Sequence, residues 1–331
     1  MYTSNLFLSL LAGVLISTSA VAAAPAAQPA PTSVNHVQAG YYRTQFGDFE
    51  VTALSDGTLA IPAADLLTNA KPGEVANRLA AAYQSTSVHT SVNAYLIKTS
   101  DNRLILVDAG TGQLFGPSLD KLTASLKRAG YEPEQINDIL ITHIHTDHVG
   151  GLMDGTRMVF PNAVLHVEKK EAAFWLSPEN RAKAPDDSKK YFDQAVEKVQ
   201  PYVDAGKVKT FDGATELFPG IRSIPSPGHT PGHSFYAIES KGEKLVFWGD
   251  VVHVSAVQMP DPAVTIVFDV DPKTAAITRR KAFEDAAAGR YWVAGDHLSF
   301  PGIGHLQKDS EGYRWVPIPY VNDYYNGKGA K

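Results

Sequence analysis

The sequence contains no cysteine among its 331 residues. Disulfide bonds, thiolate metal ligands and cysteine nucleophiles are therefore excluded, so any metal must be held by histidine or carboxylate side chains. A long apolar run is also missing, because residues 6–16 fall short of the about 20 residues that cross a bilayer. Positive charge is not in excess either: 30 Lys and Arg against 35 Asp and Glu give a net charge of −5. This balance argues against a nucleic-acid partner, and the short apolar run argues against stable membrane insertion.

The amino terminus has most features of an export signal. Residues 6–16 are apolar, and the small residues Ala20-Val21-Ala22 that follow resemble a signal-peptidase site. No Lys or Arg precedes Arg43, so the positive segment that usually begins a signal peptide is missing. We expect a signal peptide over residues 1–22, an Ala/Pro-rich linker over residues 23–40, and a periplasmic or secreted protein.

Alternating strand and helix patterns through residues 41–331 predict a single domain. Residues 46–54 predict a strand that is closed by a turn at Asp56-Gly57. Residues 118–129 predict a helix whose first residue, a serine, caps it. A second helix is predicted from the Asp-Pro pair at position 271 to residue 288. Two sheets packed face to face with helices outside are the simplest architecture for this order of elements.

Four metal-capable side chains occupy one short segment. Residues 143–148 read His-Ile-His-Thr-Asp-His and follow the apolar run of residues 139–141. The run predicts a buried strand, and Gly150-Gly151 allow a tight turn, so the motif lies in a loop at a strand end. Imidazole and carboxylate groups bind zinc and similar divalent ions. On an extended segment the first two histidines share a face, whereas the aspartate and the third histidine diverge and could hold a second ion.

Three further candidate ligands occupy the same kind of position. His229 lies in a turn after a strand-like segment, and Asp250 and His297 each follow an apolar run that ends near a glycine. A single histidine at a strand end is more often structural than ligating, but four such loops together predict convergence on one site. The predicted ligands of a two-ion site are His143, His145, Asp147, His148, His229, Asp250 and His297.

This set of residues resembles the metallo-β-lactamase superfamily in its dinuclear hydrolase form. Residues 41–43, 47–50, 174–176 and 297–305 additionally resemble the methyl parathion hydrolase family. The resemblance implies an α/β (α+β) domain, the αβ/βα four-layer sandwich of the metallo-β-lactamase fold, with the metals at one edge of the two sheets. It places His143, His145 and His229 on one ion, Asp147, His148 and His297 on the other, and Asp250 between them.

The resemblance implies a metal-dependent hydrolase in which a hydroxide that bridges two ions attacks an aryl phosphotriester, such as methyl parathion, or an aryl ester. Zinc is the expected metal, although manganese, cobalt and iron suit the same donors. Asp147 and Asp250 are the expected catalytic carboxylates, and homodimerisation is implied by the family likeness alone. Two alternatives stay open: a lactonase of the dihydrocoumarin or acyl-homoserine-lactone type, and a non-catalytic metal-binding module of the same fold.

The resemblance also indicates a substrate pocket. Phe115, Trp175 and Tyr191 would line the leaving-group side, with ordinary core packing as the alternative. His253 stands where the methyl parathion-type enzymes have an aliphatic residue, and Phe268 is bulkier than its counterpart. A narrower and more polar pocket disfavours phosphotriesters and leaves lactones and aryl carboxylic esters open.

The other polar candidates receive structural predictions. Asp108 either orients a ligand imidazole or forms a turn, and Asp296 adds a carboxylate next to His297. His233 and His305 are expected to brace the site loops. Surface or core positions without ligation are expected for the three remaining histidines, His36, His89 and His166.

Overall fold

The computed structural model describes residues 38–322. Every element described below lies within these residues, which belong to one compact unit. The predicted signal peptide lies outside the described residues, as does the predicted linker apart from residues 38–40, and both stay predictions. Within residues 38–322, no helix combines the length and apolar character needed to cross a membrane.

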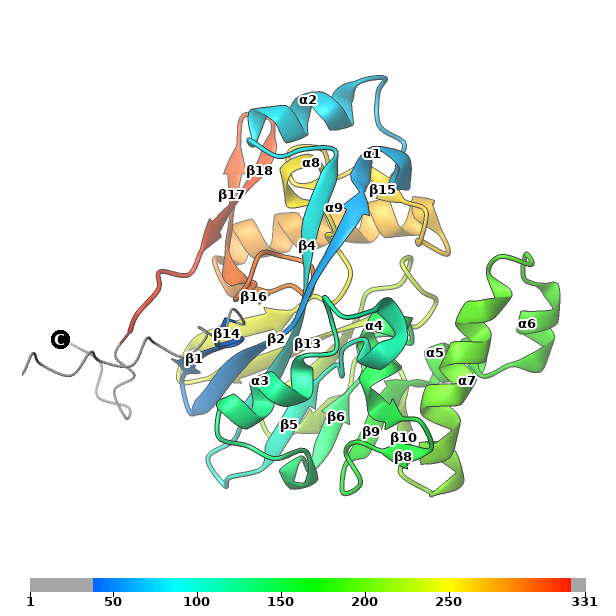
Figure 1. The fold of residues 1–331 in the computed structure, drawn as a ribbon. Coiled ribbons are helices and arrows are strands. Elements are labelled where there is room, and N and C mark those ends of the chain that lie inside the picture. Colours follow the sequence, from blue (N-terminus) through cyan, green and yellow to red (C-terminus); the bar gives the residue numbers. More distant parts are fainter. Residues whose placement is uncertain (1–37, 323–331) are drawn as a thin grey trace, which may run out of the picture. The chain divides into compact units, whose positions relative to one another are not determined.

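Two seven-stranded sheets form the centre of the described structure (Figure 1). The first sheet is ordered β1 (Tyr41–Phe46), β2 (Phe49–Pro62), β4 (Ser87–Lys98), β5 (Leu104–Val107), β6 (Asp138–Leu140), β9 (Val164–Glu168) and β10 (Val208–Phe211). The second sheet is ordered β11 (Glu216–Phe218), β12 (Ile221–Pro225), β13 (Ser234–Ser240), β14 (Glu243–Phe247), β16 (Trp292–Ala294), β17 (Ile303–Asp309) and β18 (Gly312–Pro317). Two short pairs complete the strands: β3 (Leu67–Thr68) with β15 (Thr265–Ile266), and β7 (Met153–Asp154) with β8 (Arg157–Met158).

Helices cover the outer faces of both sheets. Those that follow strands of the first sheet are α3 (Leu122–Arg128), α4 (Thr146–Val149), α5 (Lys169–Trp175), α6 (Pro178–Lys183) and α7 (Lys189–Asp204), with the 3-10 turns η1 (Gly112–Phe115), η2 (Pro133–Gln135) and η3 (Gly150–Leu152). On the second sheet lies α9 (Pro272–Gly289), and α1 (Ala63–Leu66), α2 (Glu74–Ala81) and α8 (Ser255–Gln258) gather around the far ends of β2 and β4 (Figure 1).

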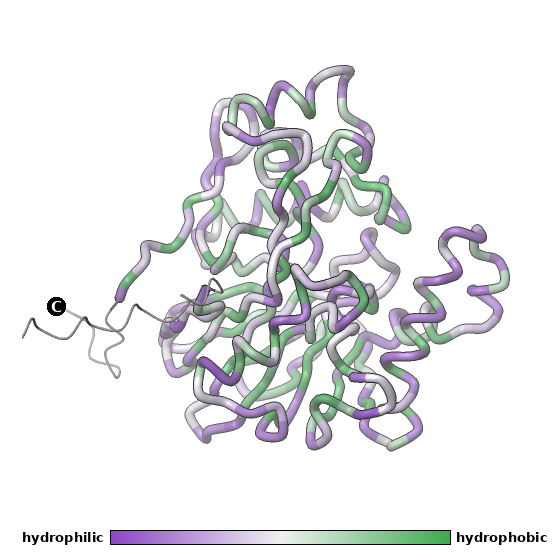
Figure 2. Tube along the Cα trace, viewed as in Figure 1, coloured by the Kyte–Doolittle hydropathy of each residue, from purple (hydrophilic) through white to green (hydrophobic). Residues whose placement is uncertain are grey.

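Three apolar interfaces define four layers. One joins α3 and α7 to the first sheet, as Leu126 and Val199 pack with Ile139. A second lies between the sheets, where side chains of both, such as Val107 and Phe247, share one cluster. A third joins the second sheet to α9 and includes Val246, Val293 and Phe283. Figure 2 shows the apolar residues concentrated along the strands, as layers that are covered on both faces require. The predicted four-layer sandwich of two central sheets with helices outside is confirmed.

Two local predictions were wrong for the same reason. The strand does not end at Asp56-Gly57, because β2 continues to Pro62 through a register shift between Ser55 and Gly57. The extra residue turns the Asp56 carboxylate toward α3, where Oδ1 accepts the backbone N–H groups of Lys121 (2.9 Å) and Leu122 (2.8 Å). Helix α3 therefore begins at Leu122, because a carboxylate distant in sequence takes the role expected of Ser118.

The strand ends explain why distant residues meet. In the first sheet β5, β6 and β9 are parallel, so their carboxyl ends lie at one edge. In the second sheet β14 and β16 are parallel, and β12 has the same direction because both β12 and β14 pair antiparallel with β13. Loops that leave the carboxyl ends of these strands are thereby brought to a common edge.

Candidate metal centre

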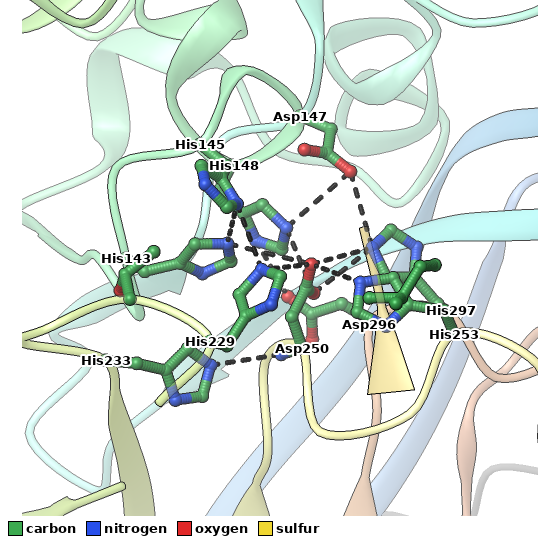
Figure 3. A network of polar contacts seen from close by, with 12 residues as sticks. His143, His145, Asp147, His148, His229, His233, Asp250, His253, Asp296 and His297 are labelled. Carbon is green, nitrogen blue, oxygen red and sulfur yellow. Dashed lines mark hydrogen bonds and ion pairs between the residues drawn. The ribbon is translucent and has the colours of Figure 1, made fainter. Parts of the chain in front are cut away.

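The seven predicted ligands leave the strand ends at this edge. The loop after β6 carries the first four, from His143 to His148, and the last two of these lie in the single turn of α4. The β12–β13 turn carries His229, the loop after β14 carries Asp250, and the loop after β16 carries His297. Figure 3 shows all seven side chains directed toward one another, with Asp250 in their middle.

Three imidazoles and one oxygen of Asp250 form the first group of candidate ligands. Nδ1 of His145 lies 3.1 Å from Nε2 of His143 and 2.9 Å from Nε2 of His229. Oδ2 of Asp250 lies 3.6 Å from Nε2 of His143 and 3.3 Å from Nε2 of His229. Three ring nitrogens and one carboxylate oxygen thus face a common point.

The second group comprises Asp147, His148, His297 and the other oxygen of Asp250. Oδ1 of Asp250 lies 3.1 Å from Nε2 of His148 and 3.1 Å from Nε2 of His297. Oδ2 of Asp147 lies 3.3 Å from Nε2 of His297 and 3.7 Å from Nε2 of His148. Oδ1 of Asp250 therefore faces the second group, whereas Oδ2 faces the first group and also lies 3.1 Å from Nε2 of His297, an arrangement that suits a carboxylate shared by two cations.

The spacing of these atoms fits coordination of a metal ion. Donors around a tetrahedral zinc at 2.0–2.1 Å lie about 3.3 Å from one another. Four of the six donor pairs in the first group are separated by 2.9–3.6 Å and four of the six in the second by 3.1–3.7 Å, and every pair lies within 4.8 Å. His148 Nε2 and Asp250 Oδ1 are moreover buried without a hydrogen-bond partner among the described residues. A cation between them would satisfy both atoms.

The opposite ring nitrogen of four ligands is anchored to the protein. Nδ1 of His229 contacts Asp269 Oδ1 at 2.8 Å, and Nδ1 of His297 contacts the Ser91 carbonyl at 2.9 Å. Such anchors fix the ring orientation and leave the inner nitrogen free to act as a ligand. The other two anchors are Asp108 Oδ2, 2.8 Å from Nδ1 of His148, and Thr142 Oγ1, 3.0 Å from Nδ1 of His143.

The pKa shifts at the centre reflect burial and the close packing of carboxylates against imidazoles; burial lowers the pKa values of His143 and His145 well below the usual range, whereas the other ligands respond mainly to their charged neighbours. Burial raises the pKa of Asp250, but the imidazoles of His148 and His297 outweigh it and hold this pKa well below its ordinary value. Burial lowers the pKa of His148, yet Asp250 and Asp147 raise it well above the usual range. Burial lowers the pKa of His229, while Asp250 and Asp269 bring it to about 9. Ionised carboxylates that attract protons this strongly also favour a divalent cation.

The predicted pocket residues lie at different distances from the centre. Trp175 is buried with its ring edge-on to His145, at 5.1 Å between ring centroids, and Tyr191 lies 6.5 Å from the same ring. His253 is also buried, and its Nε2 lies 3.1 Å from Oδ2 of Asp250.

The two remaining pocket candidates are more exposed. The ring of Phe268 lies 6.3 Å from that of His253 and is 37% exposed. Phe115 ends η1 and is 38% exposed, and no ring contact joins it to the described centre. The geometry thus supports four of the five candidates as neighbours of the centre and leaves Phe115 as a prediction.

The sequence reasoning missed several buried polar partners. Asp269 was not singled out, although an aspartate within the apolar run of residues 264–270 needs a buried partner. Glu171 sits in a charged stretch with the appearance of a solvent-exposed helix start, and no sequence signal marks it. Asp296 was noted only as a neighbour of His297, whereas its Oδ2 lies 3.2 Å from Nδ1 of His148.

Comparison with known proteins adds independent findings. Residues 89–294 match the Metallo-beta-lactamase superfamily. An N-acyl homoserine lactonase from Bacillus sp is 31% identical over 122 residues, which are 37% of this chain and 40% of that protein. The match thus spans about two fifths of the length of this curated relative.

Two solved structures match most of the chain. The structure titled hydrolase AbOPH in beta lactamase superfamily has a TM-score of 0.82 and 38% identity, and covers 86% of this chain and 100% of its own. AidC, a dizinc quorum-quenching lactonase in complex with a homoserine product, has a TM-score of 0.80 and 26% identity, and covers 86% of this chain and 99% of its own. Relatives of this chain therefore include metal-dependent hydrolases with two zinc ions.

Proposed function

The chain belongs to the metallo-beta-lactamase superfamily, and we propose that it is a dinuclear metal-dependent hydrolase that opens lactones. The observation that carries the proposal is the position of Asp250, whose two oxygens face two separate groups of donors. Lactone substrates are supported by the similarity to an N-acyl homoserine lactonase and to the dizinc lactonase AidC.

Each ion would have its own donors and share Asp250. When bound, two such ions polarise a substrate oxygen and bring the pKa of a coordinated water to about 7. Zinc is the metal proposed, since all the donors are imidazoles and carboxylates and AidC is a dizinc protein. The first ion would take His143, His145 and His229, and the second Asp147, His148 and His297.

Asp147 is placed to handle protons on the open side of the centre. Its side chain is 23% exposed, whereas those of His148 and Asp250 are almost completely buried. In lactone hydrolysis water adds to the carbonyl carbon, the ring carbon–oxygen bond breaks, and the departing alkoxide takes up a proton to give a hydroxy acid. Asp147 can accept the proton of the attacking water and return it to this alkoxide.

The surroundings of Asp250 favour a flat substrate. His253 lies beside the shared carboxylate, with Nε2 3.1 Å from Oδ2 of Asp250, and the Phe268 ring lies 6.3 Å from the His253 ring. A lactone carbonyl is planar, whereas a phosphotriester carries three substituents on a tetrahedral centre and needs more room. Trp175 and Tyr191, beside His145, offer apolar ring surface to the rest of the substrate.

Hydrolysis of aryl phosphotriesters and aryl esters is the second candidate. The same two-ion arrangement acts on phosphorus as well as on carbonyl centres. An aryl leaving group is stable as an anion and depends little on proton return from Asp147. The segments that resemble methyl parathion hydrolases are the observation in favour of this alternative.

A substrate panel tests the proposal. Purified protein loaded with zinc is assayed on an acyl-homoserine lactone, dihydrocoumarin, an aryl acetate and an aryl phosphotriester, with Asp250→Asn as the inactive control. We expect the highest kcat/KM on a lactone. A preference for the phosphotriester would replace the lactonase proposal by the second candidate. Lack of turnover on every substrate, together with fewer than two ions per chain, would favour the non-catalytic binding module.

Export and dimerisation stay predictions from the sequence. Sequencing of the mature amino terminus from a periplasmic fraction would test cleavage after residue 22. Light scattering of the purified protein would test the predicted homodimer.

A further inference from the structure

Glu171 is a buried carboxylate outside the proposed ligand set. It lies in the first turn of α5 with no measurable exposure to solvent. No Lys, Arg or His of residues 38–322 forms an ion pair with it. Four neutral donors are instead directed at its two oxygens: three come from two different ligand-bearing loops, and the fourth is the indole N–H of Trp175 in α5 itself.

One oxygen of Glu171 holds the loop that carries His143 and His145. Oε1 accepts the backbone N–H of Ile144 at 2.8 Å, between the two histidines in sequence. The same oxygen accepts the indole N–H of Trp175 at 2.9 Å. The Trp175 ring packs edge-on against His145. Oε1 of Glu171 therefore binds both the backbone of the loop and the tryptophan that packs against its second histidine.

The other oxygen of Glu171 holds the turn that carries His229. Oε2 accepts the Thr230 hydroxyl at 2.7 Å and the backbone N–H of Gly232 at 2.9 Å. A Cβ atom at position 232 would lie 2.4 Å from the backbone nitrogen of Glu171. Glycine at 232 therefore allows the turn to approach α5 closely enough for these bonds.

We propose that Glu171 is a positioning residue that fixes the separation of the two loops and thereby sets the affinity for the ion held by His143, His145 and His229. The inference rests on the proposed function, because it assigns a role around one of its two metal ions. The loops belong to different sheets, and Glu171, from a third segment, touches both. A carboxylate suits this place, since an amide offers one acceptor oxygen and would turn its own N–H groups toward two of the four donors.

The effect is specific to this ion because the other group is anchored elsewhere. His148 is held through Nδ1 by Asp108, and His297 is held by the Ser91 carbonyl. Neither histidine, nor Asp147, contacts Glu171 in the described part of the chain. Loss of the Glu171 contacts is therefore expected to weaken one site and spare the other.

The chain offers a matched control in the same helix. Glu168 precedes the first residue of α5 and is also buried. Its carboxylate accepts the backbone N–H groups of Lys170 and Glu171, and it makes no hydrogen bond to either ligand loop. Glu168→Gln therefore perturbs a buried glutamate that adjoins both Glu171 and Gly232, but it removes none of the four hydrogen bonds to the Glu171 carboxylate.

Zinc affinity measured by competition with a chromophoric chelator tests the proposal, with each site isolated in the full chain. His297→Ala removes a ligand of the second ion, so zinc titration reports on the first group. His229→Ala removes a ligand of the first ion, so zinc titration reports on the second group. We expect Glu171→Gln to weaken zinc binding by about 10- to 100-fold in the first background, as removal of outer contacts to metal ligands typically does. Binding in the second background stays unchanged, and Glu168→Gln changes neither.

Three outcomes would overturn the proposal. Unchanged zinc affinity of the folded Glu171→Gln protein in the first background is one, and equal weakening in both backgrounds is another. If Glu171→Gln does not fold, Thr230→Val takes its place, because it removes only the 2.7 Å hydrogen bond to Glu171 with little change in shape. Thr230→Val must then weaken zinc binding at the first site selectively, and its failure to do so is the third outcome. Absence of zinc binding by the unmodified chain would instead overturn the proposed function itself.

Discussion

Nε2 of His148 lies 3.1 Å from Oδ1 of Asp250, and neither atom has a hydrogen-bond partner among the described residues. Both side chains are almost completely buried. Two unsatisfied buried polar atoms of this kind carry a desolvation cost that a shared partner removes. The pair therefore marks the place where the proposed second ion contributes to stability as well as to chemistry.

Removal of metal is expected to lower the thermal stability of the chain. At a free concentration about 100 times its dissociation constant, a bound ion adds about 2.7 kcal/mol, or roughly 5–10 °C in Tm for a domain of this size. Differential scanning calorimetry before and after chelation, and again after zinc is restored, measures the change. A metal-free protein with the same Tm as the zinc-loaded one would contradict the prediction.

Asp250→Asn is expected to reduce metal content from two ions per chain toward one and to lower turnover by about 100-fold or more, because even outer partners of metal ligands contribute 10- to 100-fold. An amide has one acceptor oxygen where the carboxylate presents one to each group. Elemental analysis and steady-state kinetics check the two effects. Asp187→Asn, at an exposed position, is the control and should leave both values unchanged.

His145→Ala is expected to abolish most turnover without unfolding the domain. Nδ1 of His145 lies 3.1 and 2.9 Å from the other two imidazoles of the first group. The substitution therefore removes the proposed metal-ligand nitrogen that lies between those two imidazoles. Circular dichroism should show an unchanged fold. His89→Ala, which removes an exposed histidine of β4, should keep full activity. Retained turnover in His145→Ala would count strongly against the proposed centre.

Asp138→Asn is expected to destabilise the fold at neutral pH by about 2 kcal/mol, a typical contribution of hydrogen bonds to a charged group. Burial raises the pKa of Asp138, but hydrogen bonds from His166 (2.8 Å) and Arg103 (2.6 Å) outweigh it and hold the pKa below its ordinary value. A depressed carboxyl pKa stabilises the fold above the unfolded pKa of about 3.9, and this contribution is lost as the pH falls through the folded value.

Urea unfolding from pH 7 downward measures this difference. The gap in unfolding free energy between the unmodified chain and Asp138→Asn should be largest near pH 7 and should close as the pH falls below about 4. Asp285→Asn breaks an exposed ion pair with Lys281 in α9 and should leave the free energy of unfolding nearly unchanged at every pH. A gap that does not depend on pH would show that the Asp138 carboxylate is not the source of the stability.

The fold and the candidate ligands were predictable because their signals are local. The apolar strand before residue 143, the glycines after it and the histidines between them are adjacent in sequence. The same order of strand, glycine and polar residue recurs before Asp250 and His297. Local signals of this kind do not depend on how the chain packs, so they survive in the structure.

The partners that hold the ligands could not be predicted in this way. Asp269 contacts a histidine 40 positions earlier in the chain, and Glu171 joins two loops of different sheets. Asp56 takes over the cap of α3 from 66 positions away. Each contact exists only because separate elements pack against one another, and no nearby residue pattern records it.

The sequence by itself determined which atoms are available: without cysteine, only imidazoles and carboxylates can serve as ligands, and their loops follow strand ends. The tertiary structure alone decided that Asp250 lies between two groups, which nitrogen of each ring faces inward, and that Glu171 connects two loops. The physical reason is that the register and packing of the two sheets fix distances between residues far apart in the chain.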